Sequence, residues 1–467
     1  MTNKLFGTDG VRGIANIYPM NANFAFSLAK VLSNLVCTEK KKVAIGKDTR
    51  ISGDMLEAAL SAGFTSNGVS VISLGIVPTP LLTLETQNLD VDMSLMITAS
   101  HNPHQDNGIK LIDKNGDKFP DDFYTKVEGF LEQEERNNNN STNNNNNTEN
   151  QEQVKNPSPL PLGRIIKNNE VIETYIEKMR NIAPNYKAFQ GLKIVLDCAN
   201  GAYHYILPQT FKDLGAGVIA INNTPNGYNI NENCGTQHLE ALSQTVIDSH
   251  AHFGIAVDGD GDRVILVDNN GSEIDGDQLV CFLAQYLKKQ NKLKNNAVIT
   301  TEWSNLGLGN YLKNNGFSYD KSKVGERYVI DLMKENGAIL GGEVVGHIVL
   351  SDYAKTGDAL ATAIILTLGY LEDGRQMSEI FPIFEPYPCL IKNIKFSTKE
   401  YMQQSVEYDD VKQALETAKK ELGEDSNLIA RKSGTEPVIK LRIEAKDALL
   451  VNKWSQILTD LIMQYKK

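Results

Sequence analysis

The sequence has few cysteines and no long apolar run. Its five cysteines are scattered along 467 residues and never form a C-x-x-C pair, which argues against a disulfide framework or a structural zinc site. Reduced thiols are typical of the cytoplasm. No stretch of about 18 apolar residues occurs that could span a bilayer, and residues 1–7 lead into no apolar signal segment. We therefore expect a cytoplasmic protein.

Basic residues are also in the minority. Lys and Arg number 47 against 58 Asp and Glu, which gives a net charge of −11. This balance argues against general binding to nucleic acid or to an anionic membrane, because both select a basic surface. A small phosphorylated ligand is not excluded, since a local basic pocket can hold one. The length predicts about two to four domains.

One segment has almost no apolar residues. Residues 137–153 read NNNNSTNNNNNTENQEQ. Asparagine disfavours both helix and strand, so we expect a disordered surface insertion here. A proline-rich turn follows at residues 157–161, and it places a domain boundary near residue 160.

The rest of the chain shows a pattern that recurs three times before residue 375. Each copy has an apolar strand, an amphipathic helix, a second strand, more helix and a third apolar strand, which predicts largely parallel α/β sheets. The last part instead has a strand in which Ile439, Leu441 and Ile443 alternate with Lys440, Arg442 and Glu444, which predicts a half-exposed strand, and then a long amphipathic helix. We expect three similar α/β domains with mixed, mainly parallel sheets and a C-terminal α+β domain around one central cleft. The predicted domains are residues 1–160, 161–256, 257–372 and 373–467.

A polar loop follows the third strand of each copy. The loops are TASHNP at residues 98–103, DGDGDR at 258–263 and GEVVGH at 342–347. Ligands of open α/β sheets bind outside the carboxyl ends of the strands. Three equivalent loops could therefore converge on one site.

The second loop is rich in carboxylates. Asp258, Asp260 and Asp262 alternate with glycines, and a divalent cation such as Mg²⁺ relieves the repulsion between such close charges. An EF-hand is excluded, because Arg263 and Asn269 stand where it needs Gly and Glu. An aspartyl-phosphate enzyme and a solvated acidic turn stay open as alternatives. Arg263 either steadies the carboxylates or contacts phosphate.

The first loop offers a candidate nucleophile. Ser100 alone says little, because serine is common in turns. Here His101 and Asn102 follow it directly, and Lys110 comes shortly after. No Ser-His-Asp triad can be defended from this order. A serine near a cation site and basic groups fits phosphoryl transfer better than acyl transfer, because positioning and charge neutralisation do most of that catalysis.

Other polar groups have plainer alternatives. A lone histidine is usually a structural hydrogen-bonding group, but His101 and His347 both lie in loops after strands, so we weigh the two roles equally. Glu343 also lies in a loop that follows a strand, and it could bind substrate hydroxyls. The segment RKSGTEP at residues 431–437 offers hydroxyls, backbone N–H groups and a guanidinium to an anion, with a plain tight turn as the alternative.

Together these four loops resemble those of the α-D-phosphohexomutase family. TASHNP, DGDGDR, GEVVGH and RKSGTEP occur in the family's order, and the resemblance runs from Phe6 into the C-terminal domain. Residues 6–13, 323–328 and 431–437 are most similar to the bacterial phosphoglucosamine mutase branch of that family. Val345 stands where the family usually has Ser, which removes one hydroxyl that could bind a sugar.

The resemblance implies a reaction. It implies interconversion of glucosamine 6-phosphate and glucosamine 1-phosphate, for UDP-N-acetylglucosamine and cell-wall synthesis. A phosphorylated Ser100 would give its phosphoryl group to the phosphorylated amino sugar, and the bisphosphate would turn around and return the other phosphate. The resemblance also implies one Mg²⁺ per subunit and glucosamine or glucose 1,6-bisphosphate as activator. The sequence leaves the oligomeric state open, with a homodimer as one option.

Roles for individual residues follow from the same resemblance. The catalytic residues that it implies are Ser100, His101, Lys110 and Arg12. The metal ligands are Ser100, Asp258, Asp260 and Asp262. The substrate-binding residues are Arg263, Glu343, His347 and Arg327. The phosphate-binding residues are Arg431, Ser433, Gly434 and Thr435.

Three alternatives remain. The chain could be a phosphomannomutase/phosphoglucomutase of the same family. A phosphatase with an aspartate nucleophile would leave Ser100 and the 431–437 loop without a role. A non-catalytic sugar-phosphate-binding protein would be expected to have lost Ser100 or an aspartate, and both are present.

Overall fold

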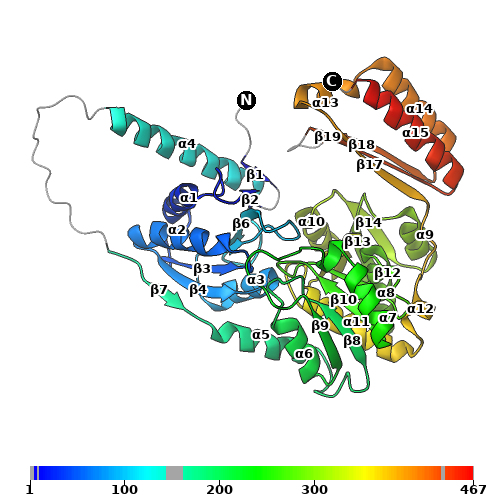
Figure 1. The fold of residues 1–467 in the computed structure, drawn as a ribbon, viewed down its shortest axis with the longest axis horizontal. Helices are drawn as coiled ribbons and strands as arrows, with labels where there is room; N and C mark the ends of the chain where they lie inside the picture. The colour runs from blue at the N-terminus through cyan, green and yellow to red at the C-terminus, as the bar shows by residue number, and fades with distance from the viewer. Residues whose placement is uncertain (1–4, 8–9, 144–160, 433–436, 466–467) are drawn as a thin grey trace, which may run out of the picture. The chain divides into compact units, whose positions relative to one another are not determined.

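A computed structural model of the protein describes residues 5–7, 10–143, 161–432 and 437–465 (Figure 1). They belong to two compact units. The first draws on residues 1–302 and 320–381, and the second on residues 303–319 and 382–467. Within the described ranges, no helix combines the length and the apolar character needed to cross a bilayer. The cysteines are unpaired, and four of the five are buried.

The first sheet of the larger unit carries the serine loop. Its strand order is β1-β2-β6-β5-β3-β4-β7. The strands are β1 (Phe6–Gly7), β2 (Gly10–Ile14), β3 (Lys42–Lys47), β4 (Ser70–Ile76), β5 (Met93–Ile97), β6 (Asp106–Asp113) and β7 (Ile165–Lys167). Strands β5, β3, β4 and β7 run parallel, whereas β6 is antiparallel to both β5 and β2. β5 is buried throughout, so the serine loop leaves directly from the core.

Helices cover this sheet. One core contains residues of the strands and of α1 (Ala22–Leu35), α2 (Ser52–Ser66) and α4 (Asp121–Asn143), and α3 (Thr79–Asn88) packs against β3 and β5. The side chain of Asn21 begins α1 by accepting a hydrogen bond from the Phe24 N–H at 2.9 Å. α4 continues to Asn143. The expected disorder is therefore wrong for residues 137–143, where the preceding helix extends into the asparagines; residues 144–153 lie outside the described ranges.

The second sheet carries the aspartate loop and has the order β12-β11-β10-β8-β9. Its strands are β8 (Lys193–Asp197), β9 (Gly217–Ile221), β10 (Phe253–Val257), β11 (Val264–Val267) and β12 (Glu273–Ile274), and its helices are α5 (Glu170–Arg180), α6 (Ile206–Asp213) and α7 (Glu240–Ser249). β8, β9 and β10 are parallel, and β11 returns antiparallel to β10. The predicted boundary after residue 256 is wrong, because the aspartate loop is the turn of this hairpin. β7 likewise joins the first sheet although it lies beyond the boundary at residue 160.

The third sheet has the order β14-β13-β15-β16. Its strands are β13 (Ala297–Thr301), β14 (Ser318–Ser322), β15 (Leu340–Gly342) and β16 (Ile348–Leu350). They are accompanied by α8 (Gly276–Lys289), α10 (Glu326–Asn336), α11 (Ala359–Asp373) and the short α12 (Met377–Ile380). β15 is parallel to β13 and antiparallel to β16. The GEVVGH loop is thus also a hairpin turn, so the last two copies share one geometry.

The smaller unit has the α+β character expected for the C-terminal region, but it begins at residue 382 instead of 373 and also includes residues 303–319. Its antiparallel sheet, β17-β19-β18, comprises β17 (Cys389–Lys395), β18 (Ser426–Lys432) and β19 (Val438–Ala445). The helices are α9 (Leu306–Asn314), α13 (Lys399–Ser405), α14 (Asp409–Leu422) and α15 (Ala448–Gln464). Ile439, Leu441 and Ile443 are buried as the alternation predicts. β19 is not half-exposed, however: Arg442 donates to the Trp303 carbonyl and Glu444 accepts from the Leu306 N–H at 2.7 Å.

Gly63 sets the approach of α2 to α1, and substituting it tests the packing. A Cβ at residue 63 would lie 2.6 Å from the Phe26 carbonyl oxygen and 2.7 Å from the Ala29 Cβ. We expect Gly63→Ala to lower the free energy of unfolding by about 1–3 kcal/mol, because the two helices must separate. The measurement is the urea midpoint by circular dichroism.

Gly129 in α4 gives the matched control, because a Cβ there would meet nothing within 4 Å. Gly129→Ala should raise stability by about 0.5–1 kcal/mol through helix propensity alone. A Gly63→Ala protein as stable as the wild type would contradict the close packing.

Candidate active site

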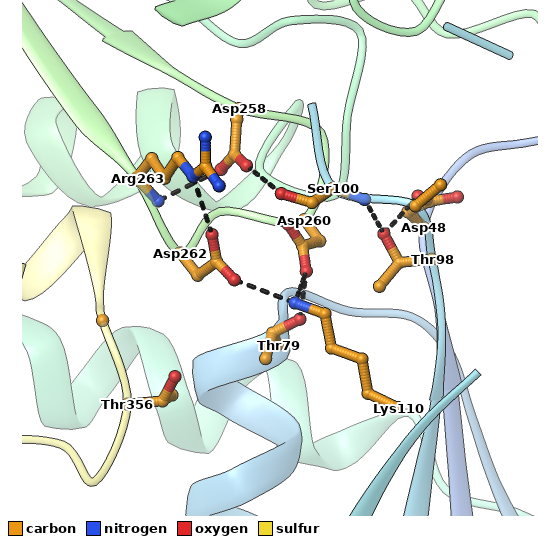
Figure 2. A network of polar contacts seen from close by, with 12 residues as sticks. Asp48, Thr79, Thr98, Ser100, Lys110, Asp258, Asp260, Asp262, Arg263 and Thr356 are labelled. Atoms are coloured by element: carbon orange, nitrogen blue, oxygen red, sulfur yellow. Dashed lines mark hydrogen bonds and ion pairs between the residues drawn. The ribbon is translucent and has the colours of Figure 1, made fainter. Parts of the chain in front are cut away.

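The serine loop begins where β5 ends. Ser100 is 1% exposed and has a φ of +53°, in the left-handed region that serine rarely adopts. Its N–H donates to Thr98 Oγ1 at 2.9 Å, and its own hydroxyl donates to Asp258 Oδ2 at 2.7 Å (Figure 2). Residues 158 positions apart in sequence are thus in direct contact. The hydroxyl is aimed at the aspartate loop, not at solvent.

The aspartate loop gathers its three carboxylates. Asp258, Asp260 and Asp262 are buried, and one oxygen from each lies within 4.8 Å of the others. Lys110 Nζ donates to Asp260 Oδ2 at 2.7 Å and to Asp262 Oδ2 at 2.9 Å, and Thr79 also donates to Asp260 (Figure 2). The Oδ1 atoms of Asp260 and Asp262 are buried without a hydrogen bond.

The charges of this cluster are not balanced by hydrogen bonds alone. Burial raises the pKa of Asp258 well above its usual range, and the charges of Asp262 and Asp260 raise it further. Burial also opposes ionisation of Asp262, but Lys110 and His347 outweigh it and hold the pKa of Asp262 well below its usual range. Clustered carboxylate oxygens with unused acceptor atoms are the donor set that Mg²⁺ prefers, so these residues fit such an ion.

Basic groups surround the serine loop. Lys110 lies on β6 opposite Met96 of β5, which places its amino group among the aspartates. Arg12, on β2, donates from Nη1 to the Ala99 carbonyl at 3.3 Å. His101 Nδ1 lies 3.4 Å from Ser100 Oγ. Burial, together with the charges of Arg263 and Arg12, lowers the pKa of His101 to about 3, so its imidazole is neutral near pH 7.

The GEVVGH loop reaches the aspartates through a histidine. His347 is 4% exposed, with Nδ1 3.5 Å from Asp262 Oδ1 and Nε2 3.0 Å from Glu326 Oε1. Burial alone would lower the pKa of His347, but the carboxylates of Glu326 and Asp262 raise it to about 10. Glu343 accepts a hydrogen bond from the Gly325 N–H at 3.1 Å. Both side chains therefore face the groups at the start of α10.

The predicted arginines lie in different places. Arg263 follows the aspartates, with Nε 3.9 Å from Asp262 Oδ1. Arg327 instead pairs with Asp121 at 2.7 Å and lines a cavity of about 230 Å³ beside Lys110. Arg431 belongs to the smaller unit, where it is an exposed residue of β18. Ser433, Gly434 and Thr435 lie outside the described ranges.

Comparison with known proteins identifies the family. Models for phosphoglucomutase/phosphomannomutase match in sequence order: α/β/α domain I at residues 3–138, domain II at 173–271, domain III at 275–387 and the C-terminal domain at 392–460. The chain belongs to the phosphohexomutase family. The domain II match contains the aspartate loop, in agreement with the β10–β11 hairpin.

Individual relatives agree with this assignment. The chain is 41% identical to a phosphoglucosamine mutase from Brucella anthropi, covering 99% of this chain and 98% of that protein. It is 40% identical to one from Carboxydothermus hydrogenoformans, covering 96% and 97%. A solved phosphoglucomutase/phosphomannomutase family protein from Burkholderia thailandensis has the same fold, with a TM-score of 0.77, 22% identity and coverage of 100% and 98%.

Some residues of this phosphohexomutase site were missed by sequence reasoning. Glu326 is buried, accepts a hydrogen bond from Thr356 and pairs with Lys118 and His347. In the sequence, the one sign of Glu326 is its position directly after a glycine, where a helix can begin. It lies in the segment 323–328, which supported the family resemblance but did not itself mark Glu326 as a site residue. Thr79 had no signal, because its partner Asp260 is 181 residues away.

Glu326 gives a prediction on stability and pH. Burial opposes its ionisation, but Lys118 and His347 hold its pKa well below the usual range. Because the pKa is depressed in the folded protein, its contribution to stability is present above its ordinary pKa and is lost as the pH falls below that value. We expect Glu326→Gln to lower the free energy of unfolding by about 3 kcal/mol at pH 7, since it removes the buried carboxylate that pairs with both Lys118 and His347.

Urea unfolding at several pH values measures this effect. The gap between wild type and Glu326→Gln should narrow as the pH falls below about 4.5, where the glutamate protonates in the unfolded chain. Asp331→Asn is the control: its carboxylate is 53% exposed and 3.7 Å from Arg327, so it should change stability by less than about 1 kcal/mol. If the difference in free energy of unfolding between wild type and Glu326→Gln does not change with pH, the result argues against the buried ion pairs of Glu326.

Proposed function

We propose that this protein is a phosphoglucosamine mutase that interconverts glucosamine 6-phosphate and glucosamine 1-phosphate through a phosphorylated Ser100. One observation carries the proposal: the Ser100 hydroxyl lies 2.7 Å from a carboxylate of a buried cluster suited to a divalent cation. Relatives of about 40% identity over nearly the whole chain are phosphoglucosamine mutases, which favours this substrate over mannose or glucose phosphates.

The phosphoryl group moves in two balanced steps. In the first, the bond from phosphorus to Ser100 Oγ breaks and a bond to the free hydroxyl oxygen of the sugar phosphate forms, while the proton of that hydroxyl ends on Ser100 Oγ. In the second, the bisphosphate has turned around: the bond from its other phosphorus to the sugar oxygen breaks, a bond to Ser100 Oγ forms, and the Ser100 proton ends on the sugar oxygen. The imidazole of His101 has its Nδ1 3.4 Å from Ser100 Oγ, which makes it a candidate for moving the proton of Ser100.

Cationic side chains offset the charge of these steps. A phosphoserine carries about −1.5 to −2 charges at neutral pH and would repel a phosphorylated sugar. Lys110, Arg12 and Arg263 line the serine and aspartate loops, where they would lower this repulsion. Asp258, Asp260, Asp262 and an oxygen on Ser100 would hold one Mg²⁺ per subunit, which would neutralise charge on the transferring group.

Substrate contacts complete the proposal. Glu343, His347, Arg263 and Arg327 would bind the sugar phosphate. Arg431, Ser433, Gly434 and Thr435 would hold the phosphate that is not reacting. Val345 is 45% exposed and offers no hydroxyl, so the sugar contacts of this loop would come from Glu343 and His347. Activation by glucosamine or glucose 1,6-bisphosphate, a cytoplasmic location and a homodimer stay predictions.

Loss of the hydroxyl tests the phosphoserine. The wild type should carry one phosphoryl group of about 80 Da by intact mass, and Ser100→Ala should lack it. In a coupled assay with glucosamine 6-phosphate, turnover should fall by more than about 1,000-fold, because the covalent route is removed. Ser33→Ala is the control, since it loses a buried hydroxyl that bonds only within α1. Turnover that survives Ser100→Ala would exclude the mechanism, whereas preference for mannose 6-phosphate would change only the substrate.

Removal of a carboxylate tests the metal site. We expect Asp260→Asn to weaken Mg²⁺ or Mn²⁺ binding by more than about 10-fold in calorimetry, because a charged ligand is lost. Thermal stabilisation by Mg²⁺ should shrink in parallel. Asp268→Asn is the matched control: Asp268 is buried but accepts hydrogen bonds from Asn270 and Ser272 in another turn. Equal affinity in Asp260→Asn and the wild type would remove the metal site from the proposal.

A further inference from the structure

The backbone of the serine loop is held by side chains outside the loop. A left-handed serine persists only where the surrounding structure enforces it. The carbonyl oxygens of Ser100 and Asn102 accept hydrogen bonds from the same two donors, Arg50 Nη2 and Asn231 Nδ2. Two side chains from different parts of the larger unit therefore fix the same turn.

All the N–H groups of the Arg50 guanidinium take part in the hydrogen bonds that fix this turn. Its side chain is fully buried, and each of its five N–H groups has an acceptor. Nε donates to Asp48 at 2.9 Å. Nη2 donates to the serine-loop carbonyls of Asn102 at 2.7 Å and Ser100 at 3.0 Å. Nη1 donates to the Pro103 carbonyl of the same loop and to the Asp106 carbonyl at 3.0 Å, where β6 begins. A lysine has three donors and no planar fork, so it cannot replace these contacts.

Asn231 completes the arrangement from the second sheet's side. Its Nδ2 donates to the Ser100 carbonyl at 2.8 Å and to the Asn102 carbonyl at 2.9 Å. Its own backbone is fixed in turn, because its N–H donates to the Ala199 carbonyl at 2.9 Å. The serine loop is thus tied to the domain that carries the aspartates.

Asp48 links Arg50 to the serine from the other side. Its carboxylate pairs with Arg50 and accepts a hydrogen bond from Thr98 Oγ1 at 2.7 Å. Thr98 Oγ1 in turn accepts from the Ser100 N–H at 2.9 Å (Figure 2). Both the N–H and the carbonyl of Ser100 are therefore held, while its hydroxyl remains available to Asp258.

We infer that Arg50 and Asn231 are positioning residues for phosphoryl transfer at Ser100, an inference that rests on the proposed function. Phosphorylation would bring a charge of about −1.5 to −2 next to Asp258, and repulsion would push the loop away from the aspartates. Arg50 and Asn231 contact only backbone carbonyls of the loop. They hold Ser100 in place whichever group its side chain carries, which matters because small misplacements of reacting atoms are costly.

Two variants and one control test this inference. We expect Arg50→Lys to lower kcat by about 100-fold and Asn231→Ala by about 10-fold, with KM within about twofold of the wild type, because positioning acts on the chemical step. Hydrogen exchange in residues 98–106 should be faster in both. Arg180→Lys is the control: it changes an arginine paired with Asp213 at 2.7 Å, far along the chain from the serine loop. Arg180→Lys should change neither kcat nor the hydrogen exchange of residues 98–106.

The outcomes separate positioning from folding. A kcat within about twofold of the wild type in Asn231→Ala overturns the inference. The inference is also overturned if activity falls only in proportion to the amount of folded protein while hydrogen exchange in residues 98–106 is unchanged. If Arg50→Lys does not fold, Asn231→Ala decides alone. A wild type without turnover would instead contradict the proposed function, and the exchange rates would still show whether these two residues hold the loop.

Discussion

The close approach of the serine loop to the aspartate loop is the constraint on which the site depends. A Cβ at Gly259 would lie 2.7 Å from the Ser100 carbonyl oxygen, and a Cβ at Gly201 would lie 2.4 Å from the Gly259 carbonyl oxygen. Glycine is thus required at residue 259, where the serine loop approaches, and at residue 201, which packs against Gly259. Without it, the loops could not bring the Ser100 hydroxyl to 2.7 Å from Asp258.

That approach concentrates negative charge, and the surrounding layers compensate for it. Lys110 neutralises part of the cluster from the first sheet, and His347 does so from the third. His347 is held by Glu326, which is paired with Lys118 of the first domain. Charges of alternating sign therefore run from the aspartates through the third domain and back to the first. Because buried charges need partners, this chain of ion pairs ties the domains of the larger unit together.

The sequence predicted those features that depend on local pattern. The repeated strand–helix order gave the fold class, and polar residues directly after buried strands marked the loops that meet around Ser100. Features that depend on distant partners were missed. The alternating pattern of β19 predicted an exposed face, but Trp303 and Leu306 bury Arg442 and Glu444. Spacing could not show that Thr79 reaches Asp260 across 181 residues, nor that Arg50 binds the serine loop.

The groups that meet at Ser100 come from three sheets but from one compact unit. Ser100, the aspartates and the GEVVGH loop all belong to the larger unit. The proposed reaction transfers a phosphoryl group from Ser100 and later back to it, so the reacting groups must have the same geometry at both transfers. Loops that leave fully buried strands and are joined by buried ion pairs can keep these distances while the bisphosphate turns around, because each loop is anchored in a packed core.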